Sequence, residues 1–234
     1  MGVSGIGAFQ EIMNGFDFSR ILSLLLSVIP ALICITLHEL SHGLVALWLG
    51  DDTAKRAGRL TLNPIKHLDP MGLVMMVAFH VGYAKPVPVN MYRFKNPKRG
   101  MALTALAGPV SNLLIAAVFL FLYGLVLVPL QKSAVGLYVI RLLNTTAIMS
   151  IGLAIFNFLP IPPLDGSKVL LALLPDESYA KLMRYERYGS ILVFALAMTG
   201  ALGGLLNNAI TYVYNTMFPI AYGGYQLAKV FMGA

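Results

Sequence analysis

Long apolar runs, separated by short polar loops, extend over most of this 234-residue chain. A helix needs about 20 apolar residues to cross a bilayer, and five of the runs are long enough. We therefore expect five membrane-spanning helices. Their approximate ranges are Arg20 to Gly50, Arg99 to Pro129, Val135 to Leu159, Tyr188 to Leu206 and Ala209 to Phe231.

The segments between these helices predict other structure. Met71 to Val81 is apolar but too short to cross, so we interpret it as re-entrant. Lys55 to Leu62 and Lys85 to Phe94 show partial alternation with β-branched residues, which is typical of strands. The sequence thus predicts an all-α polytopic membrane protein. We expect about five to six transmembrane helices, a re-entrant segment and a small membrane-associated β-sheet.

Composition supports the membrane assignment. Hydrophobic residues make up 58% of the chain and charged residues 12%, and the mean hydropathy is +0.76, far above that of an ordinary soluble domain. No charged or Ser-rich linker divides the apolar runs, so we expect one integral membrane domain over residues 1–234. The first residues lack the cationic start and cleavage site of a signal peptide. We therefore expect the first apolar helix to remain in the mature protein.

The net charge of +7 and the pI near 9.5 do not indicate nucleic-acid binding, because no basic helix face or basic-aromatic interleave is present. Loops rich in Lys and Arg stay on the cytoplasmic side of a membrane. Such residues gather at 51–69, 83–99 and 160–187, whereas 130–136 holds only Lys132. We therefore expect the first helix to begin outside and end inside, and the loop at 160–187 to be cytoplasmic.

Two histidines and a glutamate interrupt the first apolar run, in TLHELSHGL. On a helix, His38 and His42 lie one turn apart on the same face, where two imidazoles can bind one metal ion. Glu39 is rotated by about 100° from His38, which suits a base beside the ion. HExxH is the helix signature of zinc hydrolases. The alternative is a buried hydrogen-bonded cluster, but ionisable groups at membrane depth cost several kcal/mol and normally carry function.

Among the acidic residues, Asp165 in NFLPIPPLDGSK is the best third ligand. Catalytic zinc usually takes three protein ligands, and aspartate oxygen is a common donor. The nearby prolines fix the backbone, and Gly166 permits a sharp turn. Asp165 could instead belong to a solvated Asp-Gly turn. The predicted topology favours the ligand, because it brings Asp165 and the two histidines to the same side of the membrane.

At this point three ordered motifs carry a family resemblance: HELSH, AGPVSN at 107–112 and NFLPIPPLDG at 157–166. The chain resembles the site-2 protease family of intramembrane zinc metalloproteases. GRLTLNPIKHLDPMG at 58–72 is similar to the usual sequel of HExxH in that family. The chain has no room for a PDZ domain or a CBS pair, so it resembles the compact subgroup without them.

The resemblance implies one zinc ion per chain, bound by His38, His42 and Asp165. It implies that Glu39 is the catalytic acid and base, and that Asn157 positions the substrate or stabilises the oxyanion. The reaction would be hydrolysis of peptide bonds within or near transmembrane segments of membrane proteins. The expected partners are therefore transmembrane protein substrates and the lipid bilayer. We expect a multi-pass protein of a prokaryotic plasma membrane with its active site towards the cytoplasm; the sequence leaves the oligomeric state open.

An unwound substrate helix could add as a strand to the KPVPVNMYRF edge, as peptides do in β-augmentation. Two other functions remain open: a membrane metal-ion transporter, and a zinc-bearing scaffold that binds membrane proteins without cutting them. Glu39 favours hydrolysis, because zinc ligation alone does not need it. Among the weaker candidates, His67 is a possible donor or a loop histidine, Cys34 a packed thiol or a ligand, and Asn112 a site residue or a helix contact.

Overall fold

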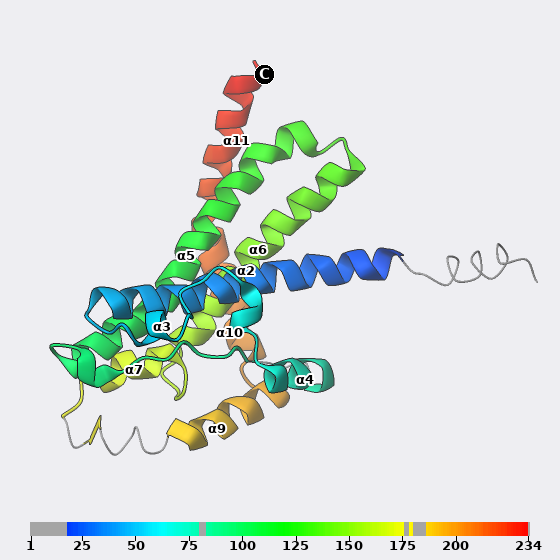
Figure 1. Ribbon diagram of the computed structural model, residues 1–234. Helices are drawn as coiled ribbons and strands as arrows, with labels where there is room; N and C mark the ends of the chain where they lie inside the picture. The colour runs from blue at the N-terminus through cyan, green and yellow to red at the C-terminus, as the bar shows by residue number, and fades with distance from the viewer. Residues whose placement is uncertain (1–17, 80–82, 176–177, 180–185, 234) are drawn as a thin grey trace, which may run out of the picture.

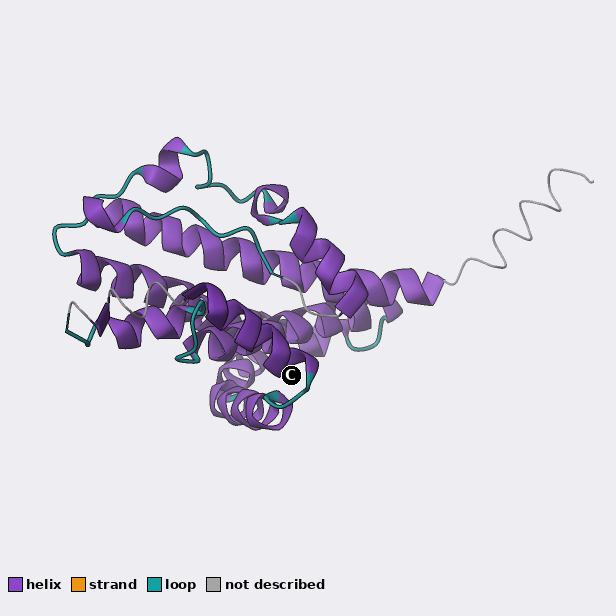
Figure 2. Ribbon diagram, turned by 90° about the horizontal axis from the view of Figure 1, so that it is seen from below, coloured by secondary structure: helices purple, strands orange, loops and turns teal. Residues whose placement is uncertain are grey.

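A computed structural model describes residues 18–79, 83–175, 178–179 and 186–233 of the chain, which are mostly helical (Figures 1 and 2). The first residues, for which the sequence predicts no signal peptide, lie outside these described ranges. The longer helices are α2 (Phe18–Trp48), α4 (Pro70–Phe79), α5 (Pro97–Leu130), α6 (Ala134–Phe158), α9 (Glu186–Met198), α10 (Gly203–Met217) and α11 (Pro219–Met232). The short ones are α3 (Thr53–Arg56), η1 (Pro64–His67), η2 (Met91–Arg93) and α7 (Asp165–Leu171).

Three helices, α2, α5 and α6, are long and apolar enough to cross a membrane, and each matches a predicted span. Their outer surfaces are apolar as well: only 17% of the most hydropathic stretch of α5 is buried within the protein. Lipid is the solvent that suits such a surface. The protein is therefore an integral membrane protein.

The C-terminal helices differ from the prediction. The expected span from Tyr188 to Leu206 breaks at residues 199–202, and α9 is bent by 85° from the helices that follow it. The expected span from Ala209 to Phe231 is divided between α10 and α11 at Phe218. This region supplies at most one further span, so the predicted five to six crossings are not confirmed among the described residues. Gly200, with a φ of 68°, ends α9 in the left-handed conformation that glycine tolerates.

The predicted β-sheet is not confirmed either. The residues that the structure places contain one isolated bridge, between Leu68 and Ala84, and no strand (Figure 2). Lys55 to Leu62 begins inside α3 and continues in turns, so the strand prediction for that segment was wrong. Lys85 to Asn90 is extended, as expected, but it bonds to side chains and loops rather than to a neighbouring strand. Residues 71–79 of the segment predicted as re-entrant belong to the short helix α4, and the last two residues of that prediction lie outside the described ranges.

Helix α5 is the centre of the fold, because it packs against α2, α6, α7 and α11 (Figure 1). Glycine allows the close approach to α11: a side chain at Gly124 would clash with the carbonyl of Ala221, and one at Gly224 with that of Phe121. Small residues at helix crossings are typical of membrane proteins, where van der Waals contact drives helix association. This packing places the N-terminal half of α5 against the turn of α2 that contains His38 and His42.

Candidate metal centre

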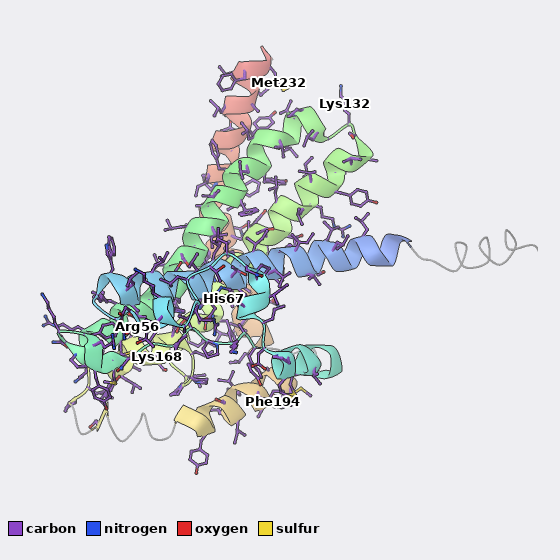
Figure 3. The ribbon with its side chains drawn as sticks, viewed as in Figure 1. Arg56, His67, Lys132, Lys168, Phe194 and Met232 are labelled. Carbon is purple, nitrogen blue, oxygen red and sulfur yellow. The ribbon has the colours of Figure 1, made fainter. Side chains whose placement is uncertain are left out.

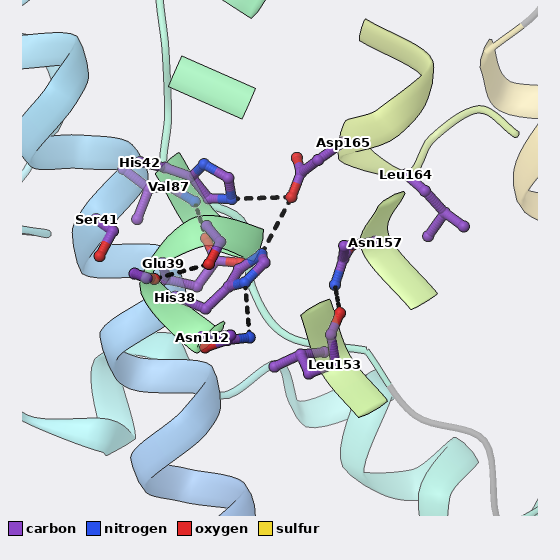
Figure 4. A network of polar contacts seen from close by, with 12 residues as sticks. His38, Glu39, Ser41, His42, Val87, Asn112, Leu153, Asn157, Leu164 and Asp165 are labelled. Atoms are coloured by element: carbon purple, nitrogen blue, oxygen red, sulfur yellow. Dashed lines mark hydrogen bonds and ion pairs between the residues drawn. The ribbon is translucent and has the colours of Figure 1, made fainter. Parts of the chain in front are cut away.

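His38 and His42 lie on the face of α2 that meets α5 (Figure 4). Both are nearly buried, and their ring centroids are 4.6 Å apart with the rings almost perpendicular. Gly108 of α5 makes room for them, because a Cβ there would lie 2.5 Å from Cε1 of each imidazole. The glycine of the AGPVSN motif is therefore a packing requirement of the two histidines.

Asp165 reaches the histidines from the start of α7. Its Oδ2 atom lies 3.1 Å from Nε2 of His38 and 3.1 Å from Nε2 of His42. Gly166 lets α7 begin directly against the end of α6, since a Cβ there would clash with the carbonyl of Phe158. The prediction that Gly166 makes a sharp turn was therefore wrong; the residue is helical and serves close packing.

Helix α5 also binds the second ring nitrogen of His42. Its Nδ1 lies 2.7 Å from the carbonyl oxygen of Thr104, and because a carbonyl only accepts, Nδ1 must carry the proton. In a neutral His42 the Nε2 atom then carries no proton, and its lone pair is directed at an oxygen of Asp165. Two acceptors 3.1 Å apart require a positive charge beside them, either a proton or a metal ion.

The second ring nitrogen of His38 faces Asn112, whose amide nitrogen lies 3.1 Å from Nδ1. The Oδ1 atom of Asn112 is buried and has no hydrogen-bond partner. Turning the amide by half a turn exchanges its oxygen and nitrogen. Oδ1 then accepts from Nδ1–H, which leaves the Nε2 lone pair of His38 for a metal ion. Metal-binding histidines almost always have such a partner.

These three donors fit zinc. One nitrogen or oxygen of each of His38, His42 and Asp165 lies within 4.8 Å of the others. Two ligands on a tetrahedral zinc, each about 2.1 Å from the ion, are separated by about 3.4 Å, close to the observed 3.1 Å. Two imidazoles and one carboxylate are also a common donor set of catalytic zinc. Burial opposes ionisation of the Asp165 carboxyl, but where a proton supplies that positive charge, hydrogen bonds from the protonated imidazoles outweigh burial and hold the pKa of the carboxyl well below its usual range.

Glu39 lies beside the metal ligands and lines the same cavity, of about 860 Å³. Its Oε2 atom accepts a hydrogen bond of 2.8 Å from the backbone N–H of Val87 (Figure 4). Asn157 of α6 lines the cavity as well, and its amide donates to the carbonyl of Leu153 at 3.0 Å. The structure therefore brings all of the predicted site residues to one cavity: His38, Glu39, His42, Asn157 and Asp165.

Known proteins identify the family. A profile of peptidase family M50 matches residues 124–200. YwhC of Bacillus subtilis (strain 168), named a "putative zinc metalloprotease", is 42% identical over 178 residues, which are 74% of this chain and 80% of YwhC. The chain belongs to peptidase family M50, the site-2 proteases. This M50 peptidase is a membrane zinc metalloprotease, and zinc is its cofactor.

Two more distant relatives agree with this assignment. Rip2 of Mycolicibacterium smegmatis, which has the same descriptive name as YwhC, is 31% identical over 176 residues, which are 73% of the M50 peptidase and 66% of Rip2. "Zinc metalloprotease MJ0392" of Methanocaldococcus jannaschii is 27% identical over 220 residues, or 94% of this chain and 53% of that relative. A search of the solved structures finds no match.

The weaker candidates separate clearly. His67 is fully buried and its Nε2 lies 2.9 Å from the carbonyl of Thr61, so it is a loop histidine bound to local backbone. Cys34 is a packed thiol that contacts the carbonyl of Thr146 at 3.6 Å. Asn112 is both a site residue and a helix contact. Its side-chain amide faces His38, and its backbone carbonyl accepts a hydrogen bond from Ser150 of α6.

Two contacts of the site were not predicted from the sequence, those of Thr104 with His42 and of Val87 with Glu39. Both are made by backbone atoms, which every residue type carries. The proline on each side of Val87 was the available signal, because Pro86 and Pro88 leave a single N–H in that stretch.

Proposed function

We propose that this M50 peptidase hydrolyses peptide bonds within or near transmembrane segments of membrane proteins, with zinc held by His38, His42 and Asp165. The observation that carries the proposal is the convergence of these three donor atoms, from α2 and α7, at the cavity that also contains Glu39. Three protein ligands leave a position open, which is the arrangement of catalytic rather than structural zinc.

When bound, zinc supplies Lewis acidity, which acidifies water and polarises a peptide carbonyl. Glu39 acts as the base: its carboxylate accepts a proton from the attacking water as the new carbon–oxygen bond forms. The same carboxyl group then gives that proton to the amide nitrogen as the carbon–nitrogen bond breaks. The products are an amine and a carboxylic acid, whose proton passes to the amine; both products leave the cavity, and Glu39 is again ionised.

Asn157 is placed to bind the substrate. Its amide lines the cavity that contains Glu39 and Asp165, and its present donation to Leu153 lies within its own helix. Rotation of the side chain would aim the amide at a substrate carbonyl or at the negative oxygen that develops during attack. The apolar walls around these few polar groups suit a peptide from a membrane segment.

We propose that the site opens towards the cytoplasm of a prokaryote. The relatives named above come from two bacteria and an archaeon. Arg56 and Lys168 lie near one end of the bundle and Lys132, in the turn between α5 and α6, lies at the opposite end (Figure 3). By the positive-inside rule, the end with the greater number of cations faces the cytoplasm.

Substitution of the base tests the reaction. We expect purified Glu39→Gln protein, reconstituted in vesicles with a labelled single-span substrate, to lose cleavage by at least about 1,000-fold while it keeps one zinc per chain. His42→Ala is the companion variant and should lose both cleavage and zinc. Undiminished cleavage by Glu39→Gln would contradict the proposal. It would also be contradicted if the wild type cleaved nothing, while the wild type and Glu39→Gln transported metal ions or bound membrane proteins equally well.

A further inference from the structure

An extended segment crosses the candidate site and is fixed at both ends; we call residues 85–90 the strap. At one end the N–H of Lys85 donates to the carbonyl of His67 at 2.9 Å, and the carbonyl of Lys85 accepts from Arg59 at 2.7 Å. At the other end the N–H of Asn90 donates to the buried carboxylate of Asp51 at 2.6 Å. The strap therefore has little freedom to move along α2.

Val87 lies between these two anchors and contacts α2 twice. Its N–H donates to Oε2 of Glu39 at 2.8 Å. Its side chain is 8% exposed and packs at Gly43, one turn further along α2, where a Cβ would lie 3.2 Å from Cγ1 of the valine. The position of this N–H relative to Glu39 is thus set by packing as well as by the hydrogen bond.

The sequence around Val87 restricts the backbone in the same way. Pro86 and Pro88 have fixed φ angles and no N–H, and a residue that precedes proline is confined to extended conformations. Both Lys85 and Val87 precede a proline. The sequence of the strap itself therefore favours an extended backbone, apart from any contact with α2. Between Pro86 and Pro88 it has a single N–H, that of Val87, which lies beside Glu39.

We infer that the backbone N–H of Val87 is a positioning donor for the catalytic base. This inference rests on the proposed role of Glu39. The bond holds Oε2, so that Oε1 remains available for proton transfer within the cavity. A charged group in a fixed rotamer loses less entropy on the way to the transition state than one that searches several rotamers. The same N–H cannot serve a substrate strand while it binds Glu39, so the strap acts at this position on the enzyme and not on the substrate.

Val87→Pro removes the N–H together with the side-chain contact at Gly43, in a segment that is already extended. We expect its kcat to fall by about 10- to 100-fold, the range for loss of one hydrogen bond to a charged group, with KM within about twofold and zinc content unchanged. Val87→Ala loses the same side-chain contact but keeps the N–H, so its kcat should fall severalfold less than that of Val87→Pro. A Val87→Pro enzyme with wild-type kcat, or one in which KM alone rises, would overturn the inference.

Amide hydrogen exchange gives a measurement that needs no catalysis. Because Pro86 and Pro88 have no amide hydrogen and Lys85 becomes the terminal amine, a peptide spanning residues 85–88 reports only the amide of Val87. We expect one slow amide to become fast in Glu39→Ala and to stay slow in Glu39→Gln, whose amide oxygen still accepts. Identical exchange in both variants and in the wild type would overturn the inference. Failure of the proposed function has a different signature, namely cleavage that persists in Glu39→Gln.

Discussion

The carboxylate of Asp165 lies 3.1 Å from the imidazole of His38, although 127 positions separate the two residues in the chain. Three features of the fold bring them together. Gly108 lets α5 approach the face of α2 that carries His38, and Gly166 lets α7 start against the end of α6. The packing of α5 against both α2 and α7 then fixes the distance between the two donors.

Gly108→Ala should weaken zinc binding. The new methyl group would lie 2.5 Å from both imidazoles, and over-packing of this kind costs about 1–3 kcal/mol. If zinc binding bears that cost, its affinity falls by about 10- to 100-fold, measured by competition with a chelator. Gly223→Ala in α11 is the control, because no atom lies within 4 Å of its added methyl group. Equal zinc affinity in the two variants would contradict the account of Gly108.

Asn112 should matter as an acceptor for His38. Asn112→Leu removes the partner of Nδ1, and we expect zinc affinity to fall by about 10- to 100-fold, as for other partners of metal-binding histidines. Asn112→Asp keeps an oxygen at that point and should bind zinc more tightly than the leucine variant. The order would be reversed if the amide served only to donate to an unprotonated Nδ1.

Asp51 and Asp52 are adjacent carboxylates with opposite surroundings. Asp51 is fully buried and accepts from the backbone of Thr53 and Asn90, so Asp51→Ala removes two hydrogen bonds to a charged group. We expect it to lower the free energy of unfolding by about 2–4 kcal/mol, seen as a lower thermal midpoint in detergent.

Asp52→Ala is the matched control for Asp51→Ala. Asp52 pairs with Arg56 and Arg93 on the surface, and the hydrogen bond from Arg56 lowers its pKa. Exposed pairs of this kind contribute little to stability, so the midpoint should stay near that of the wild type. A larger loss in this variant than in Asp51→Ala would contradict the role of the buried carboxylate.

Asn157→Leu should lower cleavage without loss of zinc. The amide lines the cavity, and the proposed zinc ligands are His38, His42 and Asp165. Removal of one donor to a developing oxyanion costs about 100- to 1,000-fold in kcat, measured on the labelled substrate. Loss of zinc in the same proportion would show that Asn157 supports the metal site and not the substrate.

Much of the fold follows from the apolar pattern. The ranges of α2, α5 and α6 differ from their predictions by only a few residues, since each is one long, mostly apolar run between polar loops. The C-terminal helices were harder to predict. Hydropathy alone does not show that the chain turns at Gly200 or Phe218, because the residues on both sides are equally apolar.

The candidate site divides in a similar way. The spacing of His38 and His42 and the isolated acid at Asp165 were visible in the sequence, because ionisable side chains stand out in apolar surroundings. The carbonyl of Thr104 and the N–H of Val87 were not predicted, since every residue type carries a carbonyl and nearly every type an N–H; the prolines beside Val87 single out its N–H but do not identify its partner. Period-2 alternation around Val87 suggested a strand, yet the prolines there direct the segment to α2 instead of to a sheet.

X-ray absorption at the zinc edge of the purified protein tests whether His38, His42 and Asp165 hold the metal. We expect one zinc per chain with two imidazole nitrogens at about 2.0–2.1 Å and oxygen ligands at about 2.0–2.2 Å. We also expect one imidazole contribution to disappear in His38→Ala and tight binding to be lost in Asp165→Ala. A sulfur ligand at about 2.3 Å, or an unchanged zinc spectrum and affinity in Asp165→Ala, would contradict this set of ligands.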